Sequence, residues 1–385
     1  MLRFLTAGES HGESLIAILE GLPAGLEVSS GQINLELARR QKGYGRGKRM
    51  EIESDKVEFF SGMRGGRTLG SPLAMRIKNR DWDNWQNTMG PEGRNRDARS
   101  VSSPRPGHAD LAGGIKYGHK DFRNILERAS ARETAARVAV GAVVKALLER
   151  CGVTIGGHVV SIGGSSPSTA EFKRHREGAI AETSPVRCLD KSAEREMVKL
   201  IDKAMEDGET LGGVFEIKAF DVPVGLGSHV HWDRRLDSDL ASAVMSIPAI
   251  KGVQIGSGFR AAQLPGSAVH DAIFYDKTRG FYRETNNAGG IEGGITNGET
   301  VILSAAMKPI PTLMSPLGSV HFLSKRKVDA AVERSDVTAV PAACVIGESM
   351  VAFVLAKHMC EKFGGDSMDE MLQNLEAYKS YIEKL

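Results

Sequence analysis

The sequence predicts one large α/β or α+β unit that folds as a single domain over residues 1–385, and three observations support this prediction. Short apolar runs of strand length alternate with longer stretches that have helical periodicity. Hydrophobic residues make up 41% of the chain and charged residues 25%, a balance that fits a globular protein with a substantial buried core. Although 385 residues would allow two domains, no proline- and serine-rich linker divides the chain.

Short apolar runs flanked by glycine or polar residues predict the strands. The first two runs are separated by the turn Gly8–Gly12 (GESHG), which places a histidine between two buried segments. The polar stretch Arg80–Arg105 has little periodicity and predicts a lid or mobile loop. In chain order the predicted strands are Leu2–Ala7, Leu15–Leu19, Val57–Phe60, Pro72–Ile77, Val153–Ile162, Gly213–Val222, one after Ser246, and Thr300–Met307.

Helical periodicity and capping residues predict the helices. Ser30 is placed to cap a helix that continues to Arg40. Ser130 and Glu133 have the spacing of a capping box, so we expect a helix there whose apolar residues between 140 and 148 share one face. The other predicted helices are Glu194–Met205, Asp237–Ser246, Pro341–Phe363 and Met368–Leu385.

One short sequence pattern occurs twice in the chain. A predicted helix followed by Gly152–Gly156 (GVTIG) recurs as a predicted helix followed by Gly252–Gly256 (GVQIG). Repeated helix–strand units of this kind are typical of internally duplicated folds. We therefore take an internal pseudo-duplication of the α+β unit as a hypothesis.

Charge and cysteine usage limit the class of protein. The formal net charge of +2 argues against a field that attracts a polyanion to the whole surface, so any anion site must be local. The four cysteines lie far apart without zinc-binding spacing, which favours a reducing cytoplasmic location. The N-terminal segment does not resemble a secretory signal, and no run approaches the roughly 18 apolar residues that span a bilayer. We therefore expect neither secretion nor membrane insertion.

A basic segment between residues 39 and 49 alternates with glycines. Glycine lets the backbone approach an anion, and arginine binds phosphate and carboxylate through paired hydrogen bonds. The segment predicts a polyanionic small-molecule site, with a solvated basic loop or a nucleic-acid patch as alternatives. Nucleic acid is disfavoured because Tyr44 is the only aromatic residue in the cluster. The arginines and lysines of this region, with those that follow it, are Arg39, Arg40, Lys42, Arg46, Lys48, Arg49, Arg94, Arg96, Arg99 and Arg105.

Two histidine motifs carry candidate functional groups. His108 follows a rigid Pro-Gly turn and stands two residues before Asp110, which could orient the imidazole for proton transfer. A surface pair or a fragment of a metal site is the alternative. His229 and His231 form an H-x-H pair that can bind zinc, but no recognisable third ligand accompanies them. A structural or solvated role is favoured for this pair, and no metal site is predicted.

Nucleotide-binding signatures fail in context. Gly256–Ala261 (GSGFRA) matches the dinucleotide fingerprint, but Pro265 and Gly266 break the helix that should follow it. The sequence contains no G-x-x-x-x-G-K-[ST] phosphate loop, which removes the anchor for kinase or ATPase chemistry. What remains is a set of arginines and lysines that can donate hydrogen bonds to an anion, together with two histidines on loops.

Long motifs in matching order resemble those of the chorismate synthases. They are Gly8–Gly12, Arg105–Arg137, Asn286–Gly290, Lys308–Thr312 and Arg334–Ala342, so the resemblance covers nearly the whole chain. It implies a homotetramer whose subunit sandwiches helices between antiparallel sheets, with reduced FMN and substrate in one cleft. The implied reaction belongs to the shikimate pathway: anti-1,4-elimination of phosphate and the C6 hydrogen from 5-enolpyruvylshikimate 3-phosphate, which gives chorismate without net redox change.

The resemblance also implies roles for single residues. His11 is expected to protonate the departing phosphate, His108 to stabilise the protonation state of reduced FMN, and Asp336 to contact flavin N5. Ser130 either assists this relay or only caps its helix. The implied substrate-binding residues are Ser10, Arg40, Arg46, Arg49, Arg105, Arg132 and Arg334. The implied flavin-binding residues are Arg128, Ala129, Ser130, Ala249, Gly293, Lys308, Pro309, Ile310, Pro311, Thr312 and Arg334.

Other functions remain as alternatives. A flavin reductase or an FMN-binding electron carrier could use the same flavin pocket, but neither needs a site for further anionic groups. Pro248 departs from the asparagine that many chorismate synthases have there, so a hydrogen bond from that side chain to flavin is absent. Some members of the family reduce flavin with NADPH, but the failed fingerprint leads us to expect an external source of reduced flavin.

Overall fold

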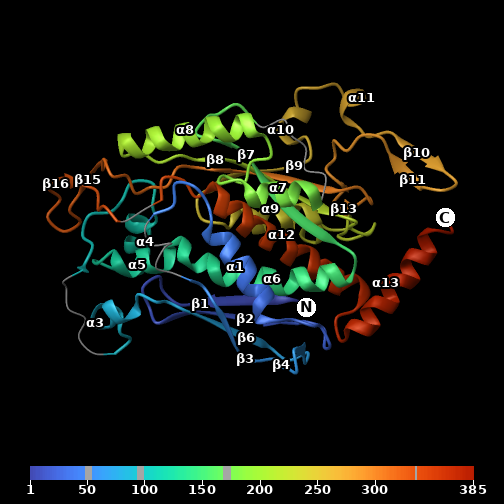
Figure 1. Cartoon of the computed structure of the whole chain (residues 1–385), viewed down its shortest axis with the longest axis horizontal. Coiled ribbons are helices and arrows are strands. Elements are labelled where there is room, and N and C mark those ends of the chain that lie inside the picture. The colour runs from blue at the N-terminus through green and yellow to red at the C-terminus, as the bar shows by residue number, and fades with distance from the viewer. Residues whose placement is uncertain (48–53, 93–98, 168–174, 334–335) are drawn as a thin grey trace.

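The computed structural model describes residues 1–47, 54–92, 99–167, 175–333 and 336–385, and a layer of helices lies between two four-stranded sheets (Figure 1). All strand pairs within these sheets are antiparallel. The predicted α+β class, with helices sandwiched between antiparallel sheets, is therefore confirmed.

The first sheet is formed by the N-terminal strands. Every second residue of its two central strands is buried against the helices, which is the pattern of a sheet with one face on the core. In spatial order the strands are β1 (Arg3–Ala7), β2 (Ser14–Glu20), β6 (Leu73–Lys78) and β3 (Val57–Ser61).

The second sheet covers the opposite side of the helix layer. Its central strand β8 buries Phe215, Ile217 and Ala219 toward the helices. In spatial order the strands are β7 (Thr154–Ile162), β8 (Gly213–Phe220), β14 (Val301–Met307) and β9 (Ile250–Ile255).

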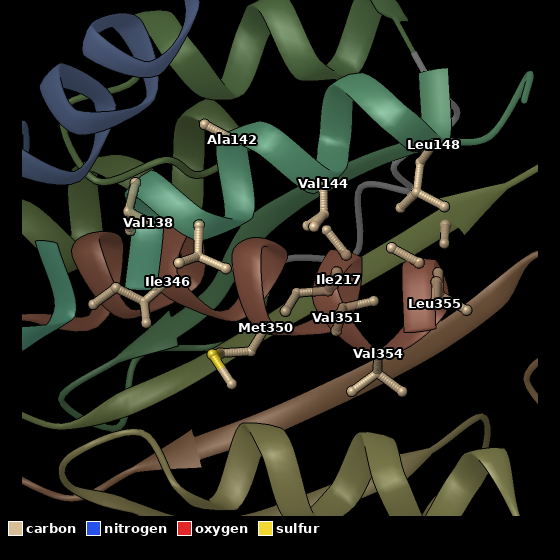
Figure 2. Packing of buried hydrophobic residues seen from close by; sticks show 14 of the residues in the cluster. Val138, Ala142, Val144, Leu148, Ile217, Ile346, Met350, Val351, Val354 and Leu355 are labelled. Carbon is tan, nitrogen blue, oxygen red and sulfur yellow. The ribbon is translucent and has the colours of Figure 1, made fainter. Parts of the chain in front are cut away.

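Four helices fill the space between the sheets: α1 (Ser30–Gln41), α6 (Thr134–Arg150), α9 (Leu236–Met245) and α12 (Val340–Phe363). Figure 2 shows apolar side chains of α6 and α12 gathered together with Ile217 of β8. By length and composition α12 could cross a membrane, but 89% of its most apolar window is buried inside the protein. Such burial is typical of the central helix of a globular core.

Glycines permit the close approach of these layers. A Cβ atom added at Gly141 of α6 would lie 2.2 Å from the Cβ atom of Ser349 of α12. One added at Gly347 of α12 would lie 2.6 Å from Cδ1 of Ile217 in β8. Real Cβ atoms do not approach so closely, and at Gly141 the backbone of Ser349 is also in the way, so that contact requires glycine. At Gly347 the side chains of Ile217 and Phe215 would have to shift.

The two sheets repeat one topology. With the strands of each sheet numbered in chain order, both sheets have the order 1-2-4-3. A helix links the second strand to the third and a long helix follows the fourth, namely α1 and α6 in the first half and α9 and α12 in the second. This repeat supports the pseudo-duplication. The repeated sequence pattern does not coincide with this structural repeat. Gly152–Gly156 leads into β7, the first strand of the second sheet, whereas Gly252–Gly256 lies at β9, its third strand.

The structure corrects two helix starts and one buried face. Ser29, not Ser30, caps α1, because its Oγ accepts a hydrogen bond from the amide three residues on at 3.2 Å. Ser130 caps the 3-10 turn before α6, through the Arg132 amide, and does not cap α6 itself. Helix α6 buries residues on nearly all sides, not on one face, because it lies between two sheets.

Shorter elements surround this core, and α8 covers the outer face of the second sheet (Figure 1). The helices are α3 (Gln86–Met89), α4 (Asp110–Tyr117), α5 (Arg123–Ala129), α7 (His175–Thr183), α8 (Lys191–Asp207), α10 (Gly258–Ala261), α11 (Gly266–Val269) and α13 (Met368–Ile382), with 3-10 turns η1 (Trp82–Asn84), η3 (Ala131–Glu133) and η4 (Trp232–Arg234). The hairpins pair β4 (Met63–Arg64) with β5 (Arg67–Thr68), β10 (Ile273–Asp276) with β11 (Gly280–Arg283), β12 (Ile291–Glu292) with β13 (Ile295–Thr296), and β15 (Gly318–Val320) with β16 (Lys327–Asp329).

We predict that Gly141→Ala lowers the free energy of unfolding by about 1–3 kcal/mol, because the added methyl group overlaps Ser349 and forces α6 and α12 apart. The control is Gly31→Ala, which adds the same group to α1 with only Ser29 Oγ nearby, at 3.8 Å. Denaturant unfolding should leave the midpoint of the control unchanged or slightly raised. An unchanged midpoint for Gly141→Ala would show that the helix pair absorbs the methyl group.

Candidate functional site

Glu127 of α5 holds the turn that carries Ser10 and His11. Its carbonyl accepts a hydrogen bond from the Ser10 amide at 3.0 Å, and its carboxylate accepts one from the His11 amide at 2.8 Å. The same carboxylate lies 2.9 Å from His11 Nδ1 and 3.2 Å from Arg123 Nη1. Burial alone would raise the pKa of Glu127, but the bonds from His11 and Arg123 hold it below its ordinary value. An ionised Glu127 accepts a hydrogen bond from Nδ1–H of His11 and leaves Nε2 for other partners.

Trp85 covers one face of the His11 ring. The two ring centroids are 3.8 Å apart and the ring planes differ by 22°. Trp85 stands between η1 and α3, within the stretch predicted as a lid or mobile loop, of which residues 93–98 lie outside the described residues. The described part of that stretch includes two helical turns, and one of its side chains packs on a predicted catalytic histidine.

Asp55 pairs with two buried arginines from distant parts of the chain. Its two oxygens accept hydrogen bonds from Arg40 Nη2 at 2.8 Å and from Arg132 Nη1 at 2.6 Å. Burial alone would raise the pKa of Asp55, but the charges of Arg132 and Arg40 lower it. Arg132 Nε also donates to Asn79 Oδ1 at 2.8 Å, and Asn79 Nδ2 donates to the Gly12 carbonyl at 2.7 Å. Asn79 thereby joins the arginine pair to the first histidine turn.

Arg46 adds a third guanidinium. Its Nη1 lies 2.9 Å from Asp336 Oδ2, and Asp336 Oδ1 accepts a hydrogen bond from the Gly47 amide at 2.6 Å. Burial lowers the pKa of Arg40, and the positive charges of Arg132 and Arg46 lower it further. The negative charge of Asp55 acts in the opposite direction but does not cancel these effects. The Nε atom of Arg40 is buried without a hydrogen-bond partner among the described residues. Guanidiniums that repel one another in a buried place favour an anion between them.

The second predicted histidine lies in a separate network. Asp110, at the start of α4, accepts hydrogen bonds from Arg105 Nε at 2.9 Å and from His108 Nδ1 at 2.5 Å. Burial alone would raise the pKa of Asp110, but the bonds from His108 and Arg105 hold it well below its usual range. Arg105 Nη1 also donates to Thr312 Oγ1 at 3.1 Å. The expected pairing of His108 with Asp110 is present, and Arg105 lies with it.

Two groups of predicted flavin positions lie beside this second network. The Lys308 amide donates to the Ala249 carbonyl at 2.9 Å, and Lys308 Nζ donates to the Gly107 carbonyl at 2.6 Å. Burial, and then repulsion by Lys251, lower the pKa of Lys308. Ala249 has a φ of 68°, a left-handed conformation that is uncommon outside glycine. The run from Lys308 to Thr312 and Ala249 therefore lie together near His108.

The remaining predicted residues lie elsewhere. Arg128, before Ala129 at the end of α5, donates from Nη1 to the Gly8 carbonyl at 3.0 Å, next to the first histidine turn. Ser130 Oγ accepts from the following turn as a cap. Gly293 stands in the β12–β13 hairpin with a φ of 60° and faces His229. Arg49 and Arg334 lie outside the described residues.

The structure also places the two motifs that the sequence analysis set aside. His231 pairs with Asp233 on the surface, and no three histidine, cysteine, aspartate or glutamate side chains gather as metal ligands among the residues described. The glycine run Gly256–Ala261 opens only the four-residue helix α10. Such a helix is too short to supply the dipole that a dinucleotide phosphate needs.

Sequence reasoning did not single out Asp55, Asn79 or Trp85. No local pattern marks them, because Asp55 and Arg132 are 77 positions apart and Trp85 follows no periodicity. Glu127 had a partial signal in its four-residue spacing from Arg123 on a helix. That spacing predicts the ion pair but not the contact with His11, which is 116 positions away.

We predict that Asp55→Asn lowers the free energy of unfolding by about 3–5 kcal/mol at pH 7, because two buried guanidiniums lose their countercharge. The pKa of Asp55 is lower in the folded protein than its unfolded value of about 3.9, so this stabilisation is complete above about pH 5 and lost as pH falls below 4. Unfolding curves of the wild type and the variant should converge in acid.

The control for this change is Glu58→Gln, which removes a carboxylate that pairs with Arg76 and Lys78 on the surface. We expect little change in stability from it, since exposed ion pairs contribute little. A stability difference between Asp55→Asn and the wild type that stayed constant from pH 7 to pH 3 would contradict the assigned ion pairs.

Comparison with known proteins identifies the family of this chain. A family model described as chorismate synthase matches residues 2–360. Proteins named chorismate synthase are 58% identical in Moorella thermoacetica, 59% in Desulforamulus reducens and 57% in Geobacter sulfurreducens, and the alignments cover 99–100% of this chain and of each relative. A crystal structure of chorismate synthase has a TM-score of 0.80 at 45% identity and covers 100% of this chain and 99% of its own. The chain therefore belongs to the chorismate synthase family of carbon–oxygen lyases.

Proposed function

We propose that this lyase converts 5-enolpyruvylshikimate 3-phosphate into chorismate by anti-1,4-elimination of phosphate and the C6 hydrogen, with reduced FMN as cofactor. The observation that carries the proposal is the cluster of Arg40, Arg46 and Arg132 joined to the turn of His11. It combines guanidiniums that bind anionic groups with an imidazole that can give one of them a proton. Membership of the chorismate synthase family supports the same reaction.

The arginine cluster suits a substrate with one phosphate and two carboxylates. Asp55 holds Arg40 and Arg132 in one arrangement before substrate arrives, so the site needs little reorganisation as phosphate departs. The buried Nε of Arg40 is a donor that substrate oxygen would satisfy. By resemblance, Arg49, Arg105, Arg334 and Ser10 complete the substrate site.

His11 is the proposed proton donor to the departing phosphate. Its Nδ1 is committed to Glu127, so Nε2 is the nitrogen that faces substrate. A carboxylate at the far nitrogen also fixes the orientation of the imidazole. His108 has the same arrangement with Asp110, and we assign it to the protonation state of the flavin.

The residues around Lys308 fit a flavin mononucleotide. Lys308 and Lys251 repel each other, and a bound phosphate would relieve that repulsion. Held by these residues, reduced FMN would supply the transient electron donation that cleavage of the C–O bond needs, without net redox change. Asp336, assigned by resemblance to flavin N5, would exchange its bonds with Arg46 and the Gly47 amide for that contact. The other residues proposed to hold flavin are Arg128, Ala129, Ser130, Ala249, Gly293, Pro309, Ile310, Pro311 and Thr312.

We further propose a single catalytic domain over residues 1–385, a homotetramer and a cytoplasmic location. One hydrophobic core that includes both sheets supports the single domain. The β10–β11 hairpin exposes Ile273, Tyr275 and Phe281, which a neighbouring subunit would cover. The cysteines are buried and free, as expected in a reducing compartment. A flavin reductase or electron carrier is not favoured, because neither explains the arginine cluster.

The decisive assay is anaerobic. With chemically reduced FMN, the purified protein should form chorismate from 5-enolpyruvylshikimate 3-phosphate, because only reduced flavin has an electron to lend. Oxidised FMN plus NADPH should give no product with this protein alone, since α10 is too short for a dinucleotide site. Product from the NADPH mixture would overturn the external source of reduced flavin, and no product from either mixture would overturn the function.

We predict that His11→Ala and His108→Ala each lower kcat by about 10²–10⁴-fold, the usual contribution of a proton-transfer group. His11→Ala should keep its affinity for flavin, whereas His108→Ala should change the absorbance of bound reduced flavin. His270→Ala, at an exposed histidine of the α11 region, is the control and should keep the wild-type rate. Wild-type turnover in either histidine variant would remove that residue from proton transfer.

A further inference from the structure

We propose that Trp85 is a positioning residue for His11, and this inference rests on the proposed role of His11 as proton donor. The indole covers a face of the imidazole and holds the ring plane so that Nε2 stays directed at the departing phosphate. Glu127 alone holds the imidazole at one nitrogen. A ring held at one edge can still tilt, and a stacked neighbour restrains that tilt.

Three separate elements converge on this imidazole. His11 comes from the β1–β2 turn, Glu127 from α5, and Trp85 from the short connection between η1 and α3. The centroid separation of 3.8 Å and the 22° angle describe a stacked pair and not an edge contact. The buried Glu127 carboxylate at Nδ1 and the indole on the face leave the Nε2 edge as the reactive edge.

Trp85 is itself held firmly. Its Nε1 donates to Asp81 Oδ2 at 2.9 Å, and its backbone amide donates to the Trp82 carbonyl at 2.8 Å. Two guanidiniums lie against the same indole, with Arg99 at 4.1 Å and Arg123 at 5.2 Å from the ring centroid. Cation–π contacts of this kind add to the restraint on the indole.

Arg123 connects both restraints on His11. Its Nη1 donates to Glu127, the carboxylate at Nδ1, while the guanidinium lies against Trp85. A tryptophan with only a structural role would need no more than burial. The indole of Trp85 instead lies on the face of the His11 imidazole and contacts Arg123, which also binds the Glu127 carboxylate. The geometry therefore points to a role in orienting His11.

Steady-state kinetics with reduced FMN test the role. Trp85→Ala should lower kcat by about 10- to 100-fold, because a misplaced reacting group costs this much, and should change KM for substrate by less than about threefold. Trp85→Phe keeps a stacking ring and should recover most of the rate. Trp232→Ala removes an exposed indole on η4 and serves as the matched control with wild-type kinetics. A raised KM with unchanged kcat in Trp85→Ala would contradict positioning.

A double-mutant cycle separates positioning from an independent effect. If Trp85 acts through His11, the variant His11→Ala/Trp85→Ala should be no slower than His11→Ala alone. If the two losses multiply, Trp85 acts independently of His11 and the proposal is wrong. If His11→Ala itself keeps the wild-type rate, the proposed role of His11 fails, and with it the catalytic part of this inference.

A fluorescence experiment tests the stacking of Trp85 on His11 without turnover. The sequence has three tryptophans, so Trp82→Phe/Trp232→Phe leaves Trp85 as the only fluorophore of its kind. The imidazole of His11 lies on the face of this indole, so adding His11→Gln should shift the wavelength of maximum emission of Trp85. Adding His270→Gln, at an exposed histidine, is the control and should leave the emission of the parent unchanged. An emission maximum that did not change on His11→Gln would overturn the stack even if chorismate forms.

Discussion

The close packing of α6 against α12 is the constraint on which the rest of the molecule depends. Gly141 lets the backbones approach at Ser349, and Gly347 lets α12 approach the second sheet. Because a helix layer must cover both sheets, this spacing sets the distance between the two halves of the fold. The same packing aligns the helix ends. Arg40 stands at the end of α1, Arg132 just before α6 and Asp336 just before α12, so three central helices converge on one site.

The site built there depends on carboxylates that hold basic groups. Glu127 holds His11, Asp110 holds His108 and Arg105, and Asp55 holds Arg40 and Arg132. Removing these charges from water costs free energy, and pairing with good geometry offsets that cost. In the proposed function, these donors would already have their orientation when an anionic substrate arrives.

A buried carboxylate also pairs with basic side chains in the core, away from the site. Glu348 of α12 is fully buried and accepts hydrogen bonds from Arg39 of α1 and Lys145 of α6 at 2.8 and 2.7 Å. Burial alone would raise the pKa of Glu348, but Arg39 and Lys145 hold it well below its usual value. These ion pairs define one relative position of α1, α6 and α12, which apolar contacts alone leave less specific.

The sequence by itself predicted the strands of the two main sheets, the core helix α12, the family and the residues proposed for the site, but not the strands of the hairpins. Alternating apolar residues, long apolar runs and long motifs are local features of the sequence, so they can be recognised without knowledge of the tertiary structure. Ser29 as the cap, the all-round burial of α6 and the equivalence of the two halves needed the structure, because they depend on which elements pack together. Tertiary structure alone decided that Asp55 joins two arginines and that Trp85 covers His11. Such contacts join residues tens of positions apart, and only the packed helix layer brings them within hydrogen-bond or stacking distance.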